Sequence, residues 1–241
     1  MNWLLLRGLG RVKEHWHLFP SKLESLDSTE TILTLNLPGI DDSSENTPWS
    51  IAEITEQVRL KWLKQKTKGD WGVIAISLGG MVAIDWCHRY PDDFKKCVSI
   101  NSSSRSSSLF RRLLPYAMLT ILKAITTRNL RKREAIILEL TTSLQTIDKP
   151  LLDKWEEILN DKKLHKVFCS QIFAASRFNL PEKLSTPTLF LAAKNDQLAH
   201  YTCSEDLAVH FDKPICLHPT AGHDLPLDDP DWIVEQIRSN F

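Results

Sequence analysis

The sequence predicts an α/β fold with a mostly parallel sheet and helices on both of its faces. Short apolar runs of strand length alternate with segments whose apolar residues have helical spacing. The alternation stops over residues 103–181, which read as helices only, and then resumes. The 241 residues, 42% of them hydrophobic, are enough for one large domain with a substantial core.

The N-terminal part of the chain contains four predicted strands, at residues 3–7, 31–39, 71–76 and 95–101. A helix is predicted over 51–66 because four apolar residues share one face: Ile51, Ile54, Val58 and Trp62. A second helix follows the third strand and ends before Pro91. Strands that alternate with helices in this way favour parallel pairing.

The C-terminal part continues the pattern with strands at 187–193 and 214–219 and helices around 203–211 and 229–239. We therefore expect a core formed by residues 1–102 and 182–241. Residues 103–181 are predicted to form a helical cap (a lid) that lies over the C-terminal edge of the sheet, where α/β proteins place their sites. The serine-rich stretch at 101–108 is expected to be the loop that leads into this cap.

The overall composition argues against several classes of protein. Thirty basic residues balance thirty acidic ones, so net charge predicts neither a nucleic-acid nor a membrane partner. The N-terminus lacks the pattern of a signal peptide, and the longest apolar stretch, 113–122, is too short for a transmembrane segment. The five cysteines are scattered without metal-ligand spacing, which indicates reduced thiols in a cytoplasmic protein with no metal and no cofactor.

Residues 75–80 read AISLGG directly after an apolar strand, which raises the question of what the lone Ser77 does. A sharp strand-to-helix turn needs small neighbours, and it leaves the serine at its apex projecting alone. Such a turn predicts that Ser77 is a nucleophile and that the amide of Leu78 points into the same space. The alternative is an ordinary turn, since the first position holds Ala75 where glycine is usual.

A serine nucleophile requires a base and an acid that orients the base. Among eight histidines, only His223 stands in a loop after the final predicted strand, next to Gly222. Asp196 follows the preceding strand and is the predicted acid, while Asp206 and Asp212 are weaker rivals. A solvated loop histidine and a helix-capping aspartate are the plain alternatives. The order of Ser77, Asp196 and His223 nevertheless matches the order that this kind of sheet requires.

The oxyanion of an acyl-transfer reaction needs two hydrogen-bond donors. One is predicted to be the amide of Leu78. The other is expected in the glycine-rich loop RGLGR at residues 7–11, which follows the first strand. A plain glycine turn is the alternative explanation for this loop.

Taken together, these motifs resemble the α/β-hydrolase fold superfamily, in its serine carboxylesterase and pimeloyl-carrier methyl esterase branch. The similar segments cover nearly the whole chain: residues 7–9, Trp16, 37–41, 75–79, 194–196 and 221–223. The resemblance implies that the second oxyanion amide is that of Leu9 and that the first two antiparallel strands of larger members are missing. Two positions depart from the family pattern, with alanine at 75 and Arg7 where histidine is usual.

The predicted function is cleavage of a carboxylic ester through an acyl-enzyme on Ser77. Thioester, amide and carbon–carbon bond cleavage can use the same groups. A perhydrolase without a cofactor has the same three residues and is an alternative. A non-catalytic binding or scaffold protein of the same fold is another, and loss of one of the three residues would be its sign.

The start of the cap is rich in both basic and apolar residues. Its basic residues are Arg105, Arg111, Arg112, Lys123, Arg128, Arg131, Lys132 and Arg133. The apolar ones are Leu109, Phe110, Leu113, Leu114, Tyr116, Met118, Leu119, Ile121 and Leu122. The favoured interpretation is an apolar underside that lines the substrate pocket and a solvated basic face. The alternatives are a basic face that docks an acidic partner, such as an acyl carrier protein, or an anionic membrane surface.

Overall fold

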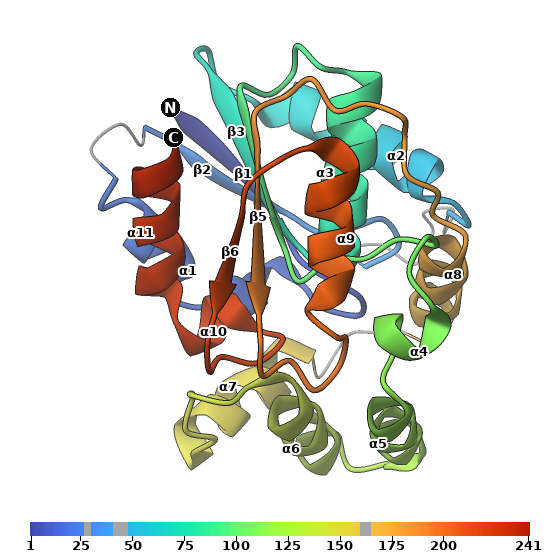
Figure 1. Ribbon diagram of the computed structural model, residues 1–241. Coiled ribbons are helices and arrows are strands. Elements are labelled where there is room, and N and C mark those ends of the chain that lie inside the picture. The colour runs from blue at the N-terminus through green and yellow to red at the C-terminus, as the bar shows by residue number, and fades with distance from the viewer. Residues whose placement is uncertain (27–29, 41–47, 160–164) are drawn as a thin grey trace.

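The computed structural model describes residues 1–26, 30–40, 48–159 and 165–241. Its centre is one parallel sheet of six strands in the order β2-β1-β3-β4-β5-β6 (Figure 1). The strands are β1 (Asn2–Leu6), β2 (Ile32–Leu35), β3 (Trp71–Ile76), β4 (Lys96–Ile100), β5 (Thr188–Ala193) and β6 (Ile215–His218). All six predicted strands are confirmed. β2 is shorter than predicted because its pairing with β1 ends at Leu35, before Pro38.

Helices cover both faces of the sheet (Figure 1). One face carries α1 (Phe19–Leu23) and α11 (Pro230–Asn240). The other carries α2 (Ile51–Gln65), α3 (Leu78–Arg89) and α9 (Thr202–Phe211). The predicted longer helices are confirmed to within a residue or so at their ends. The turn η1 (Lys13–Trp16) and the short helices α1 and α10 (Leu225–Asp228) were not predicted, because four or five residues are too few to show a helical period.

β1 is buried along its whole length because both faces of the sheet are covered. Its side chains alternate between the two faces, as strand geometry requires. Leu4 and Leu6 pack in the core on the α2–α3 side, and Trp3 and Leu5 pack in the core on the α1–α11 side. β1 therefore joins two hydrophobic cores, and the loop that follows it starts from a rigid element.

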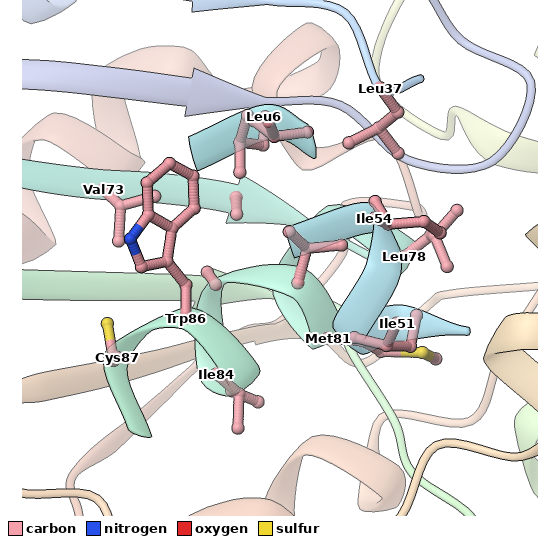
Figure 2. Packing of buried hydrophobic residues seen from close by; sticks show 14 of the residues in the cluster. Leu6, Leu37, Ile51, Ile54, Val73, Leu78, Met81, Ile84, Trp86 and Cys87 are labelled. Carbon is pink, nitrogen blue, oxygen red and sulfur yellow. The ribbon is translucent and has the colours of Figure 1, made fainter. Parts of the chain in front are cut away.

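α3 is fixed against the sheet by large buried side chains. Figure 2 shows Leu78, Met81 and Trp86 of α3 beside Ile54 of α2 and Val73 of β3. The Trp86 ring also contacts two further aromatic rings, those of Trp62 and Phe94, at centroid distances of 5.6 and 4.9 Å. This packing holds the first turn of α3, which directly follows Ser77, in one position.

The described residues between β4 and β5 form five helices, in the segment for which only helices were predicted. They are α4 (Leu109–Arg112), α5 (Pro115–Thr126), α6 (Leu130–Thr141), α7 (Lys149–Leu159) and α8 (His165–Ser176). Figure 1 shows α4 to α7 beyond the ends of β5 and β6 toward which the strand arrows point. Leu138, Leu151 and Trp155 form a small core of this cap, and Leu227 of α10 packs into it. The cap is therefore in contact with the segment that follows β6.

Within the described residues, no helix is both long and apolar enough to cross a bilayer. The five cysteines are unpaired, and three of them are buried: Cys87, Cys97 and Cys203. The described part of the chain also has no cluster of three or more His, Cys, Asp or Glu side chains that could hold a metal ion.

Candidate active site

Ser77 occupies a sharp turn between β3 and α3. Its backbone has φ 57° and ψ −118°, a conformation that residues with a side chain rarely adopt. The amide of Ser77 donates to the carbonyl oxygen of Ile100 at 2.8 Å, which holds the turn against β4. The hydroxyl has no hydrogen-bond partner among the described residues. Ala75 is fully buried in β3, so the strand accommodates alanine where the family pattern has glycine.

The two glycines after Ser77 allow strand and helix to pass close together. A Cβ atom on Gly79 would lie 2.5 Å from the carbonyl oxygen of Leu6. A Cβ atom on Gly80 would lie 2.7 Å from the Ser99 hydroxyl oxygen. Any larger residue at either position would push the helix away from the sheet. The close approach of α3 to the sheet therefore requires glycine at positions 79 and 80, as the sequence pattern predicted.

The loop after β1 packs directly on this turn. A Cβ atom on Gly8 would lie 3.1 Å from the Cβ atom of Ser77 and 3.4 Å from the carbonyl oxygen of Ile76. This contact brings the loop that carries Leu9 beside Ser77. Neither the Leu9 nor the Leu78 amide donates to an acceptor in the part of the chain that the structure describes. Their role as the two oxyanion donors remains a prediction.

Asp196 and His223 are brought together at the same edge of the sheet. His223 Nδ1 lies 2.6 Å from Asp196 Oδ2, and both residues are buried. The other carboxylate oxygen, Asp196 Oδ1, accepts from the amides of Leu198 and Ala199 at 2.8 and 3.0 Å. These bonds fix the carboxylate, which in turn orients the imidazole and leaves its Nε2 atom as the free nitrogen. Among the described contacts, no hydrogen bond joins His223 to Ser77, and such bonds are often long in unliganded enzymes.

Neither of the two rival acids has a contact with His223 among the described residues. Asp206 forms an ion pair with Arg111 at 2.9 Å and accepts from the Ser107 hydroxyl at 2.7 Å. Asp212 ends α9 in a left-handed conformation, with φ 52°. Asp196 is therefore the acid that His223 contacts.

Asn101 was missed by the sequence analysis, and it links three parts of the site. It follows β4 with a positive φ of 46°. Its Nδ2 atom donates to the carbonyl oxygen of His223 at 2.7 Å, and its Oδ1 atom accepts from the amide of Ala193 at 2.9 Å. The side chain thereby ties the His223 loop to the end of β5. A polar residue at the end of a predicted strand was the only signal that the sequence offered.

We expect Asn101→Asp to lower the free energy of unfolding by about 2–3 kcal/mol, because a buried carboxylate oxygen would face the His223 carbonyl in place of a donor. Urea denaturation followed by circular dichroism measures this change. Asn195→Asp is the matched control, since Asn195 is exposed on the same edge, and its effect should stay within about 0.5 kcal/mol. Equal losses for the two variants would contradict a positioning role for Asn101.

Arg7, which replaces the family's histidine, forms a buried ion pair with Asp224. Its two terminal nitrogens donate to the two carboxylate oxygens at 3.0 and 2.6 Å. The guanidinium also lies over the Trp16 ring, 5.1 Å from the centroid. Burial alone would raise the pKa of the Asp224 carboxyl, but the nearby Arg7 guanidinium brings this pKa below its usual range. Because Asp224 follows His223 directly, the pair connects the Gly8 loop to the His223 loop.

The cap is bound to the His223 loop through Asp228. The carboxylate of Asp228 accepts from the amide of Gly222 at 2.6 Å and from the amides of residues 143–145 at 2.8 to 3.1 Å. In addition, the Asp224 amide donates to the carbonyl oxygen of Thr141 at 2.7 Å. The end of α6 and the segment around His223 are therefore held by one set of hydrogen bonds.

The cap also contacts the loop after β1. Arg11 forms an ion pair with the buried Glu134 of α6 at 2.6 Å. The amide of Gly10 donates to Gln171 Oε1 of α8 at 3.1 Å. The loop expected to carry an oxyanion donor is thus held by the cap on one side and by Ser77 on the other.

The expectation that residues 109–122 form an apolar underside lining the substrate pocket stays a prediction, and these side chains do not form a buried core of their own. None of the nine apolar side chains named above is buried, and six of them are exposed: Leu109, Phe110, Tyr116, Met118, Leu119 and Leu122. The small residues Ala117 and Ala124 are the buried residues of α5. The physical reason is that α5 packs through these two alanines, which turns its larger side chains outward.

Two hollows occur near these elements. A gap too small to hold a water molecule borders the acid and is lined by Asn101, Ser102, Asp196, Ala199, His200, Tyr201 and Ser204. A wider surface depression lies along α9 between Arg111 and Ile215, and none of the predicted site residues lines it. The smaller space is the one next to the predicted chemistry.

Comparison with known proteins places the chain by sequence and by fold. One similar protein is the biotin biosynthesis bifunctional protein BioHC of Teredinibacter turnerae, 30% identical over 98 residues, which are 40% of this chain and 16% of that protein. The chain thus matches about a sixth of that protein's length.

Two solved structures share the fold. A lipase-esterase related protein from Clostridium acetobutylicum has a TM-score of 0.74 at 18% identity, covering 100% of this chain and 94% of that one. A thermophilic esterase from Thermogutta terrifontis has a TM-score of 0.73 at 18% identity, with 99% and 88% covered. Residues 4–230 match the alpha/beta hydrolase fold family. The chain therefore belongs to the alpha/beta hydrolase fold family.

Proposed function

We propose that the protein is a serine hydrolase that cleaves carboxylic esters. The observation that carries this proposal is the hydrogen bond of 2.6 Å between His223 and Asp196 at the sheet edge where Ser77 occupies its strained turn. A base oriented by a buried acid, at the same sheet edge as a half-buried serine in a strained turn, is the arrangement that acyl transfer needs.

In the proposed reaction, Ser77 Oγ attacks the ester carbonyl carbon, and its proton passes to His223 Nε2. The amides of Leu9 and Leu78 stabilise the oxyanion. Collapse of the intermediate breaks the bond to the alcohol, which takes the proton from His223 and leaves an acyl group on Ser77. Water then attacks the acyl-enzyme and gives its proton to His223. The second collapse returns that proton to Ser77 and releases the carboxylic acid.

The charge on the imidazole is stabilised by the contact with Asp196, and the contacts around that carboxylate support this role. Its second oxygen accepts two backbone amides, so the carboxylate cannot rotate away from His223. Asn101 holds the backbone of His223 itself. The predicted base is thus fixed both through its ring and through its main chain.

The test is labelling with a fluorophosphonate probe together with hydrolysis of p-nitrophenyl esters from acetate to palmitate. We expect one probe molecule per chain, attached to the peptide that contains Ser77, and hydrolysis with an optimum chain length. Ser108→Ala, which removes an exposed serine of the cap loop, should label as the wild type does. Absence of both labelling and turnover would favour a non-catalytic binding protein, and peracid formation from acetate and peroxide would favour a perhydrolase.

A carrier-linked acyl ester is a second candidate substrate, favoured by the similarity to BioHC. The exposed cations of the cap, such as Lys123 and Arg128, would face an acidic acyl carrier protein. The test compares the rates of hydrolysis of an acyl-carrier methyl ester and of the methyl ester of the free acid. A much higher rate on the carrier-linked ester, which decreases as the salt concentration rises, would support this substrate. Equal rates on the two esters would contradict it.

A further inference from the structure

We propose that the outward side of α4 and α5 is a docking surface for an anionic lipid bilayer. This surface, the α4–α5 face, consists of Leu109, Phe110, Tyr116, Met118, Leu119, Leu122 and Ile125, all of them exposed. A monomer rarely leaves so many large apolar side chains together in water without an interaction that covers them. The proposal concerns binding and does not depend on the ester reaction.

The way in which α5 packs creates the apolar side of this face. Ala117 and Ala124 are the buried residues of the helix. The exposed fractions of Leu119 and Leu122 are 66% and 59%. Met118, Leu119, Leu122 and Ile125 have the three- and four-residue spacing of one helical side. α5 thus presents a continuous apolar stripe away from the molecule.

The charges around the face select an anionic partner. The sequence has no acidic residue between Asp93 and Glu134, whereas ten basic residues lie there, eight of them between 105 and 133. Some are engaged within the fold: Arg111 pairs with Asp206, and Arg131 pairs with Asp153. Four exposed cations have no carboxylate partner within the described residues: Arg105, Lys123, Arg128 and Lys132. These side chains are free to meet phosphate groups.

A bilayer fits this face better than an acidic protein does. Lys123 is the single charged residue of α5, and the other free cations lie in the segments before and after the helix. A helix that lies in a membrane interface has this arrangement, with its apolar side buried among lipid chains and its cations at the headgroup level. Docking of an acidic protein would place cations in the middle of the contact. With 12 residues, α5 is too short to span a bilayer and would lie along it.

The α4–α5 face is rigidly joined to the predicted site. The amide of Leu114 donates to the carbonyl oxygen of Leu198 at 3.0 Å, and the amide of His200 donates to the carbonyl oxygen of Arg111 at 2.8 Å. Both bonds reach the loop that carries Asp196. Figure 1 shows α4 and α5 on the side of the sheet toward which the strands point. A bilayer on this face would therefore lie next to the C-terminal edge of the sheet.

The experiment is sedimentation of the full chain with vesicles of phosphatidylcholine, alone or mixed with phosphatidylserine. The chain carries Ser77→Ala so that no lipid is consumed and binding is measured apart from catalysis. We expect sedimentation only with the mixed vesicles. Leu119→Ser with Leu122→Ser should weaken binding at least tenfold, and Lys123→Gln should weaken it about fivefold. Matched controls on α2, Leu60→Ser and Lys64→Gln, should bind as the parent chain does.

Three results would overturn the proposal. The first is a chain that stays in the supernatant with both vesicle types, or sediments equally with both. The second is a Leu119→Ser/Leu122→Ser chain, with an unchanged melting temperature, that binds as its parent does. The third is a different occupant of the face, seen either as salt-sensitive binding of an acyl carrier protein or as a dimer in gel filtration that these substitutions dissociate.

Discussion

Replacement of Ser77 by alanine is expected to lower kcat for p-nitrophenyl ester hydrolysis by about 10⁶-fold, leaving only the residual rate that substrate binding and the oxyanion donors provide. The physical reason is that no other hydroxyl shares the position at the turn, beside Gly8 and the amide of Leu78. The free energy of unfolding should change little, because the hydroxyl has no hydrogen bond among the described residues to lose. Steady-state kinetics and urea denaturation of the same preparation check both parts.

A substitution of Asp196, the predicted acid, complements this experiment. Asp196→Asn should lower kcat by about 10⁴-fold, because an amide at this position favours the wrong tautomer of His223. Asp206→Asn is the matched control, since Asp206 pairs with Arg111 and not with a histidine, and its kcat should equal that of the wild type. Equal activity for all three variants and the wild type would show that the hydrolysis comes from another site or another protein.

Replacement of Arg7 by methionine is expected to lower the free energy of unfolding by about 3–5 kcal/mol. Methionine fills much of the volume, but Asp224 would remain buried without its cation and without two hydrogen bonds. Lys22→Met, which removes the cation of an exposed ion pair with Asp231, is the matched control and should cost less than about 1 kcal/mol. The double substitution Arg7→Met/Asp224→Leu should restore a large part of the loss, since both buried charges are then gone.

The pH dependence of stability gives an independent check on this pair. In the wild type the pKa of Asp224 is lowered, so its stabilisation is complete above the unfolded value of about 3.9 and is lost as pH falls through the folded value. In Arg7→Met, burial still raises the pKa of Asp224, and only the smaller effects of Arg11 and His223 oppose it. We therefore expect the folded variant to take up the proton at a higher pH than the folded wild type does. The difference in free energy of unfolding between wild type and variant should therefore decrease as the pH is lowered from 7 toward 4. A constant difference across this range would contradict the assignment.

The sheet and the predicted site residues could be read from the sequence because each has a strong local signal. Buried parallel strands are continuous apolar runs, and the turn at Ser77 is marked by the two glycines that strand and helix require. Asp196 and His223 could be chosen because parallel strands end at one edge. Their hydrogen bond depends on the conformations of the two loops that carry them, and these conformations could not be predicted from the sequence.

The residues that hold the site in place could not be predicted. Asn101 and Asp228 form hydrogen bonds with backbone amides and carbonyls of other loops. Nothing in the sequence distinguishes these two residues from the other polar residues of their own loops. The pairing of Arg7 with Asp224 spans 217 positions. The residues through which α5 packs could not be predicted, because an apolar helix has several sides that could be buried, and its buried residues are the small Ala117 and Ala124.

Asp228 couples the position of the segment after α6 to that of the His223 loop. Its carboxylate holds the amides of residues 143–145 and of Gly222 at the same time, so α6 cannot swing away without releasing the segment that carries His223. In the proposed reaction, the cap and the segment that carries His223 would then move together, and the enzyme would be inactive while the cap is open. Opening of the cap to admit substrate and alignment of His223 for catalysis would then exclude each other, and the Asp228 carboxylate is one of the groups that couple them.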